Sequence, residues 1–228
     1  MRALRFHAAR DLRIEQVAEP PAPGAGEVVV RVVTCGICGT DLHEYVAGPI
    51  VTPVEPHPLT GAQNPQILGH EFAGDVVAVG PGVRSVREGD RVAIMPLAYC
   101  SHCAYCRRGL QHLCATMGCV GLSHAWGGMA ELATVAEYQV VRLPEGVTHR
   151  QGALIEPTAV AAYGVERAGV GPGDRVLIAG TGRESTKAAI AATRRAAELG
   201  VDAALVRTPS FFKPQMTSDV FDSFSGLG

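Results

Sequence analysis

Residues 28–33 read Val-Val-Val-Arg-Val-Val, a nearly continuous β-branched run that predicts a buried strand. Three similar runs, each followed directly by proline, lie at residues 74–80, 91–95 and 137–143. Residues 47–65 are rich in proline, glycine and threonine and predict a long surface loop. Short strands that end at glycine and proline are typical of barrel-like or sandwich folds. We therefore expect a mainly β domain over residues 1–150.

The pattern changes near residue 150. An alanine-rich helical stretch at residues 153–168 is followed by an apolar run at 175–179, a helical stretch at 184–199 and a second apolar run at 201–207. A strand, helix and strand in this order predict a parallel pair, and hence an α/β segment over residues 151–228. One such unit leaves apolar faces that it cannot cover by itself. We therefore expect a truncated segment that packs poorly or depends on a partner.

The composition excludes several classes of protein. Of the 228 residues, 47% are hydrophobic and 18% are charged, which is typical of a chain with a packed core. The net charge of −2 gives no basic surface for nucleic acid. No apolar run reaches the roughly 18 residues that a membrane span needs. Arginines at positions 2, 5, 10 and 13 argue against a secretory leader, so we expect a cytoplasmic protein.

The cysteines favour metal binding over disulfides. Their number, seven, is odd, so they cannot all pair, and we expect no secretory leader. Four of these fall within one short loop, as Cys100, Cys103, Cys106 and Cys114. Zinc binds four thiolates in a tetrahedron, and a closed site of this kind is structural. His102 and His112 lie in the same loop, but four cysteines already fill the coordination shell.

A second set of metal-ligand residues is spread widely along the sequence, as Cys38, His70, Glu71 and Glu156. One soft ligand and two hard ligands would suit an open, catalytic zinc. A histidine beside a glutamate is, however, more often a surface pair. The residues alone therefore leave both interpretations open.

Several motifs point to one family. They are Cys-Gly-Ile-Cys-Gly-Thr-Asp-Leu-His at residues 35–43, Gly-His-Glu-Phe-Ala-Gly at 69–74, Gly-Asp-Arg-Val at 89–92 and the four-cysteine loop. Together they resemble the zinc-dependent medium-chain alcohol dehydrogenases, and within them the butanediol, sorbitol and threonine dehydrogenase branch. The resemblance runs from about residue 1 to about residue 180. It implies a GroES-like catalytic domain followed by a Rossmann domain for NAD.

The resemblance also implies roles for individual residues. The ligands of the catalytic zinc would be Cys38, His70 and Glu156, and Glu71 would be an acid that can enter or leave the metal shell. Thr40 and His43 would relay the substrate proton to solvent. The implied reaction is oxidation of a secondary alcohol by hydride transfer to NAD, as in butanediol dehydrogenases, with a small alcohol or ketone as substrate. A homo-oligomer would be compatible with this reading.

The dinucleotide fingerprint is incomplete. Gly180 and Gly182 match its first two glycines, but Ser185 stands where the third is expected. Glu184 adds a negative charge near the place of the pyrophosphate, and Arg207 stands where an acid for the ribose is expected. NAD(H) binding, and the choice between NAD and NADP, therefore stay open at this stage.

A second family fits residues 177–220 better. Residues 179–186 and 198–213 resemble the dihydrodipicolinate synthase and 4-hydroxy-2-oxoglutarate aldolase family. Lys187 and Lys213 do not occupy the context of that family's Schiff-base lysine, so aldolase activity is a distant alternative. A natural fusion, an assembly artefact, a chimera and a diverged, truncated dehydrogenase all fit the junction. A non-catalytic zinc-binding remnant is therefore the main alternative to a dehydrogenase.

Overall fold

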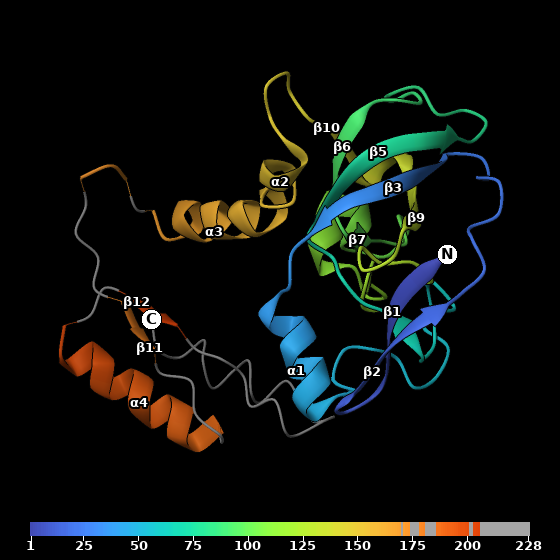
Figure 1. The fold of residues 1–228 in the computed structure, drawn as a ribbon. Helices are drawn as coiled ribbons and strands as arrows, with labels where there is room; N and C mark the ends of the chain where they lie inside the picture. The colour runs from blue at the N-terminus through green and yellow to red at the C-terminus, as the bar shows by residue number, and fades with distance from the viewer. Residues whose placement is uncertain (170, 174–177, 181–185, 201–202, 206–228) are drawn as a thin grey trace. The chain divides into compact units, whose positions relative to one another are not determined.

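The structure is a computed structural model that describes residues 1–169, 171–173, 178–180, 186–200 and 203–205. The chain forms two compact units, Met1–Val160 and Ala161–Gly228, and each is described here by itself. Figure 1 shows their helices and strands in chain order. Within the described ranges, no helix combines the length and the apolar character that crossing a membrane requires.

A five-stranded antiparallel sheet forms the centre of the first unit. Its strands, in spatial order, are β10 (Val140–Arg142), β6 (Arg91–Ile94), β5 (Phe72–Val79), β3 (Glu27–Cys35) and β9 (Leu132–Ala136). The predicted strands at 28–33, 74–80 and 91–95 correspond to β3, β5 and β6. The mainly β fold expected for this part of the chain is thereby confirmed.

The strand predicted at residues 137–143 is correct only in its second half. Its first half is the 3-10 turn η3 (Glu137–Gln139), and only β10 is extended. The cause is the buried side chain of Gln139, whose Oε1 accepts the N–H of Ala136 at 3.0 Å. Its Nε2 donates to the carbonyl oxygens of Pro96 and Leu97 at 3.2 Å. These bonds favour a turn, because a side chain there competes with the strand ladder for backbone groups.

Two smaller sheets complete the first unit. β1 (Arg2–Ala8) pairs with β2 (Asp11–Gln16) and with β4 (Gln66–Ile67), and an isolated bridge joins Ala3 to Ala130. β7 (Leu97–Ala98) and β8 (Gly118–Cys119) pair across the base of the four-cysteine loop. That loop contains the 3-10 turns η1 (Cys106–Arg108) and η2 (Gln111–Leu113). The short β7–β8 pair thus closes the loop into a separate projection.

The predicted loop at residues 47–65 is organised by one buried carboxylate. Glu44, in α1 (Gly39–Ala47), has no exposed surface. It accepts hydrogen bonds from the N–H groups of Ile50 and Val51 and from the hydroxyl of Thr52. An unpaired buried carboxylate would be costly, so these donors both satisfy Glu44 and fix the start of the loop.

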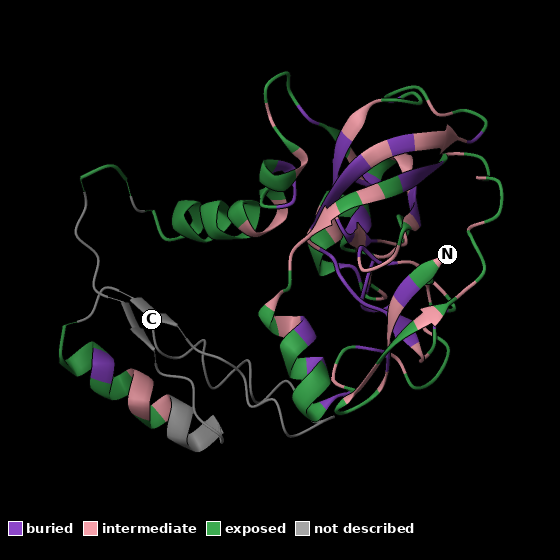
Figure 2. Cartoon of the chain, in the orientation of Figure 1, coloured by how far each residue is buried: buried purple, intermediate pink, exposed green. Residues whose placement is uncertain are grey.

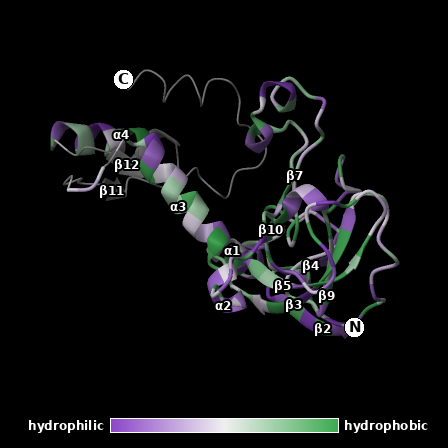
Figure 3. Cartoon of the chain, turned by 90° about the horizontal axis from the view of Figure 1, so that it is seen from above, coloured by the Kyte–Doolittle hydropathy of each residue, from purple (hydrophilic) through white to green (hydrophobic). Residues whose placement is uncertain are grey.

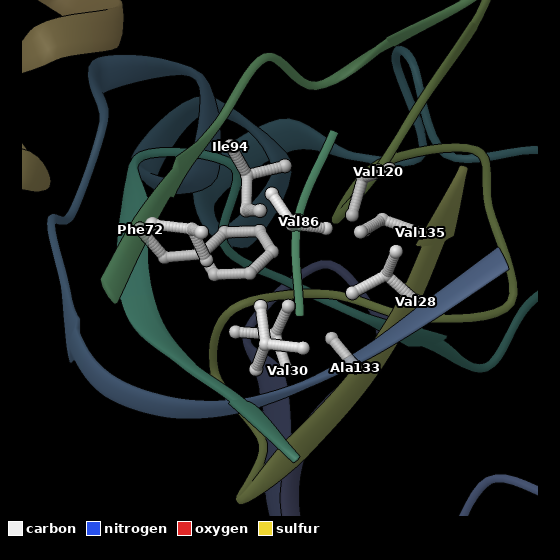
Figure 4. Packing of buried hydrophobic residues seen from close by; sticks show 10 residues of the cluster. Val28, Val30, Phe72, Val86, Ile94, Val120, Ala133 and Val135 are labelled. Carbon is white, nitrogen blue, oxygen red and sulfur yellow. The ribbon is translucent and has the colours of Figure 1, made fainter. Parts of the chain in front are cut away.

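The hydrophobic core lies against one face of the five-stranded sheet. Figure 4 shows side chains from β3, β5, β6 and β9 pointing toward one another, among them Val28, Phe72 and Ile94. Figure 2 shows buried residues on the strands of this sheet, and Figure 3 shows hydrophobic residues along them. A smaller cluster of Phe6, Leu68 and Leu122 fills the space beside β1.

Two further helices follow the sheets, α2 (His149–Gly152) and α3 (Ile155–Arg167). The second unit contains β11 (Ile178–Gly180), α4 (Thr186–Glu198) and β12 (Ala203–Leu205), and the two strands pair in parallel. Gly182 and the other residues of the predicted α/β elements that fall at 175–177, 184–185, 201–202 and 206–207 lie outside the described residues. That this unit is a truncated α/β segment stays a prediction, as does the predicted boundary at residue 150.

The core generates a stability prediction. Phe72→Ala removes a ring that is 1% exposed at the centre of the main cluster. We expect it to lower the free energy of unfolding by about 3–5 kcal/mol, because a cavity is left behind. The matched control is Val33→Ala, since Val33 lies on β3 but is 50% exposed, and it should cost less than about 1 kcal/mol. Urea unfolding followed by circular dichroism measures both; equal losses would contradict the assignment of the core.

Candidate metal centres

The four cysteines of the loop after β7 are brought together in the structure. The sulfur atoms of Cys100, Cys103, Cys106 and Cys114 all lie within 4.8 Å of one another. Thiolates at about 2.3 Å from one zinc ion would be roughly 3.8 Å apart in a tetrahedron. The Sγ atoms of Cys100 and Cys106 are 3.9 Å apart, so the loop fits a tetrahedral ion with little adjustment.

The backbone of the loop points its N–H groups at these sulfurs. Cys103 N–H donates to Sγ of Cys100 at 3.3 Å, and Cys106 N–H donates to Sγ of Cys103 at 3.4 Å. Cys100 N–H donates to Sγ of Cys114, also at 3.3 Å. Hydrogen bonds of this kind stabilise thiolates, which are the form that binds metal. Ser101 permits the tight turn by adopting a positive φ of 62°.

The four thiols differ in acidity. Backbone N–H groups of Ala115 and Cys106 lower the pKa of the Cys103 thiol to about 6. Burial, together with a hydrogen bond to Cys103, raises the pKa of the Cys106 thiol to about 12. Without metal, the loop therefore favours the thiolate at Cys103 and holds a proton on the buried Cys106. Zinc binding must displace that proton, so folding of the loop, metal binding and proton release are linked.

Three residues of the dispersed set also converge. Potential ligand atoms of Cys38, His70 and Glu71 lie within 4.8 Å of one another. Cys38 is the N-cap residue of α1, which follows β3, and His70 and Glu71 directly precede β5. The register of β3 and β5 places Cys35 opposite Phe72, so both motifs meet at one end of this strand pair.

Two glycines in these motifs lie where the segments approach closely. A Cβ atom on Gly36 would lie 2.5 Å from Oε2 of Glu71, so a side chain there would displace this carboxylate. Gly69 has a φ of +95°, and a Cβ atom there would lie 2.7 Å from the sulfur of Cys35 and 2.8 Å from the backbone N of Met129. Glycine tolerates this backbone conformation and supplies the missing space. The Cys-Gly and Gly-His-Glu motifs therefore describe how the segments that carry the ligands pack together.

Glu156 is near this group but is not one of its three members. It lies in the first turn of α3, and burial raises the pKa of its carboxyl group. His70 has the opposite effect on this pKa, whereas Glu71 adds to the increase. These interactions place Glu156 within electrostatic reach of the group. Among the described residues, Glu71 rather than Glu156 completes the cluster with Cys38 and His70.

Sequence reasoning did not assign a role to Asp41, which contacts Cys38 and faces His70. Its side chain is 4% exposed, and Oδ2 accepts the N–H of Cys38 at 2.9 Å. Oδ1 lies 3.7 Å from Nδ1 of His70, and neither atom has a hydrogen-bond partner within the described part of the chain. A metal-binding histidine almost always donates its other ring N–H to a carboxylate, a backbone carbonyl or a water. If Nδ1 turns to Asp41, Nε2 is left as the metal ligand, so these orphaned atoms fit a metal site.

A sequence signal for Asp41 did exist. An acid three residues after an N-cap residue is the pattern of a capping box, and Asp41 has this spacing from Cys38. The pattern could have predicted contact with the Cys38 backbone. It could not have predicted the approach to His70, because that depends on the pairing of β3 with β5.

The predicted relay residues lie on the same helix. The Cys38 thiol donates to Oγ1 of Thr40 across 3.7 Å, so the threonine hydroxyl is beside the sulfur ligand. His43 follows one turn later in α1 and is exposed. Residues three apart in a helix share a face. The helix thus offers a hydroxyl near the candidate metal site and an imidazole in contact with solvent.

The two remaining cysteines, Cys35 and Cys119, are thiols of low acidity. Burial raises the pKa of Cys35 to about 12, and the same cause raises the pKa of Cys119 to about 12. A thiol of such low acidity is a poor nucleophile at neutral pH. For the predicted dinucleotide site, Gly180 ends β11, and Gly182 is outside the described residues.

The arrangement of strands agrees with comparisons to known proteins. The model of the alcohol dehydrogenase GroES-like domain family matches residues 24–145. The chain belongs to this family. One relative is (R,R)-butanediol dehydrogenase from Bacillus subtilis (strain 168), which is 43% identical to this chain over 183 residues. That alignment covers 80% of this chain and 51% of the relative, so the chain spans about half the length of the curated relatives it matches.

Solved structures of the alcohol dehydrogenase family are similar as well. The crystal structure of 2R,3R-butanediol dehydrogenase from Bacillus subtilis gives a TM-score of 0.73 at 34% identity, covering 98% of this chain and 67% of that one. An alcohol dehydrogenase from Escherichia coli CFT073, complexed with NADH, gives 0.68 at 28% identity, covering 100% and 66%. These matches confirm the resemblance to the zinc-dependent dehydrogenases.

The second predicted resemblance is also confirmed. The model of the dihydrodipicolinate synthetase family matches residues 160–223 of this GroES-like chain. Most of the segment beyond residue 200 lies outside the described residues. Two family models therefore match consecutive parts of one sequence.

Removal of one sulfur tests the four-cysteine site. We expect Cys103→Ser to lower the zinc content by about one ion per chain, because three thiolates no longer close the tetrahedron. His102→Ala is the matched control: His102 is exposed in the same loop and is not one of the four clustered residues. Elemental analysis after dialysis measures the content. A loss of zinc in the histidine variant alone would contradict the four-sulfur assignment.

Asp41 provides a test of the second centre. Asp41→Asn should weaken zinc binding there by roughly tenfold to a hundredfold, because the variant loses the carboxylate that faces His70. Asp75→Asn is the control, since Asp75 also faces a histidine, with 2.7 Å between Oδ1 and Nε2 of His149. Competition with a chromophoric chelator gives both affinities. Equal weakening by the two variants would show that Asp41 has no special role.

Proposed function

We propose that this chain carries the zinc-binding catalytic centre of an alcohol dehydrogenase of the butanediol type, which oxidises a secondary alcohol by hydride transfer to NAD. The observation that carries the proposal is the convergence of Cys38, His70 and Glu71, with Glu156 within electrostatic reach. The four-cysteine loop supports it as a second, structural zinc site. The family relationship supports the reaction class.

The donor atoms suit the metal. We propose that Cys38, His70 and Glu156 would hold the catalytic zinc and that Glu71, which lies beside Cys38 and His70, would be an alternative carboxylate ligand. One thiolate, one imidazole and one carboxylate would suit a catalytic zinc that also binds an alcohol oxygen. A bound Zn²⁺ would supply a Lewis acid that lowers the pKa of that alcohol.

The chain's own residues would move the proton. Thr40 Oγ1, beside the sulfur of Cys38, would accept the alcohol proton and donate its own toward His43. His43 is exposed and would pass the proton to solvent. The carbon-bound hydrogen would leave as hydride to the nicotinamide, which balances the conversion of alcohol to ketone.

The cofactor part of the proposal rests on two glycines and on a similar structure. Gly180 and Gly182 would approach the dinucleotide, in keeping with the NADH complex of the Escherichia coli relative. We propose NAD as the hydride acceptor, a small alcohol or ketone as substrate and a cytoplasmic location. Assembly into homo-oligomers is part of the same proposal, by family relationship.

A non-catalytic zinc-binding chimera is the second candidate. The match of residues 160–223 to the dihydrodipicolinate synthetase family favours it, because that match includes the place of the dinucleotide fingerprint. In that case the chain would bind zinc and would not turn over alcohol. An aldolase-family fragment is the distant third reading.

Turnover by the zinc-loaded chain distinguishes these candidates. We expect NADH to form from NAD and (R,R)-2,3-butanediol, with about two zinc ions bound per chain. Thr40→Val should lower kcat by about a hundredfold or more, because the relay hydroxyl is lost, whereas Thr40→Ser should retain activity. NADH absorbance measures the rate. Two bound zinc ions without NADH formation would favour the non-catalytic candidate.

A further inference from the structure

A cavity of about 250 Å³ lies beside β9, on a part of the first unit that the proposed function does not use. Five of its lining residues could take part in binding, namely Glu27, Tyr99, His124, Trp126 and Tyr138. None of Cys38, His70 and Glu71 lines it. It is therefore a feature separate from the candidate catalytic centre.

The strand pairing explains why polar groups reach this cavity. Glu27 lies opposite Ala136 and Val29 lies opposite Thr134 in the pairing of β3 with β9. Val28 and Val135, their neighbours in sequence, belong to the hydrophobic core. Side chains alternate between the two faces of a strand, so Glu27 and Thr134 share the face away from the core.

The cavity has room for a small organic molecule. Its volume is several times larger than the roughly 30 Å³ that one water occupies. Thr134 contributes to the wall, but its Oγ1 is enclosed by the protein and has no hydrogen-bond partner among the described residues. Groups that pair with a ligand must therefore come from other residues of the wall.

His124 adds a hydrogen-bond donor. Burial lowers the pKa of its imidazole, which favours the neutral ring. Nδ1 is 3.3 Å from the N–H of Trp126 and accepts its hydrogen bond. The ring proton therefore resides on Nε2, for which the described part of the chain offers no acceptor.

The only formal charge on the cavity wall is negative. Oε2 of Glu27 accepts the N–H of Gly24 at 2.8 Å, and Oε1 remains available to a ligand. The wall also includes the rings of Trp126, Tyr99 and Tyr138, and the two tyrosine rings have centroids 4.5 Å apart. Aromatic rings and a carboxylate together attract ammonium groups. A hydroxyl on the same molecule would accept the hydrogen bond that Nε2–H of His124 offers.

We propose that the cavity beside β9 binds a small organic ammonium ion that carries a hydroxyl group. The ammonium group contacts the Glu27 carboxylate and the aromatic rings, and the ligand hydroxyl accepts a hydrogen bond from Nε2–H of His124. The site is independent of the zinc centres, so its occupancy does not require alcohol turnover.

Tryptophan fluorescence gives a direct test, because Trp126 is the single tryptophan of the chain and lies in the cavity wall. The full chain is titrated with ethanolamine at constant ionic strength, and its fluorescence should change and saturate. Ethylene glycol, which has the same size but no charge, should give no saturable change. Glu27→Gln should weaken ethanolamine binding at least about tenfold.

The variants keep the test interpretable. Glutamine at position 27 can still accept the Gly24 N–H, so Glu27→Gln should fold, and circular dichroism verifies this. Glu131→Gln, at an exposed carboxylate outside this cavity, is the control and should leave binding unchanged. The proposal is overturned if ethanolamine gives no saturable change, if ethylene glycol gives the same response, or if Glu27→Gln binds as tightly as the parent chain.

Discussion

The antiparallel pairing of β3 with β5 is the constraint on which the candidate catalytic centre depends. Cys35 lies opposite Phe72 at the end of this pairing, and Cys38 and His70 follow and precede these positions in sequence. A shift of one residue in register would turn the side chains of one strand to the other face. The core side chains of Val30 and Phe72 prevent such a shift, because they would leave the hydrophobic cluster. The apolar core and the metal ligands are thus fixed by one register.

The two candidate metal centres differed in how far the sequence could predict them. The four-cysteine group could be predicted from spacing, because its ligands come from one short loop whose ends are joined by β7 and β8. The group of Cys38, His70 and Glu71 could not, because its closure depends on strand register. The family resemblance supplied those residues instead. Asp41 received no role for the same reason, since its approach to His70 is a tertiary contact.

The fold shows a similar division. Continuous apolar runs predicted β3, β5 and β6 correctly, because these strands face the core. β1 and β9 were not predicted, and arginines on β1 interrupt the apolar pattern that marks a buried strand. The prediction of a strand at residues 137–139 was wrong. These residues form the turn η3, because a buried amide, Gln139, bonds to neighbouring backbone groups. Sequence patterns report average burial along a segment, and a single polar side chain can override them locally.

The buried carboxylate of Glu44 has a consequence for exchanging parts between relatives. The segment that begins at Ile50 has its first backbone groups bonded to a side chain from a different element, α1. If this segment were transplanted into a relative without an acid at the equivalent helix position, its donors would face an empty space or an apolar side chain. The helix and the segment after it are therefore one exchangeable unit. Recombination between them would separate the Glu44 carboxylate from the donors that it binds.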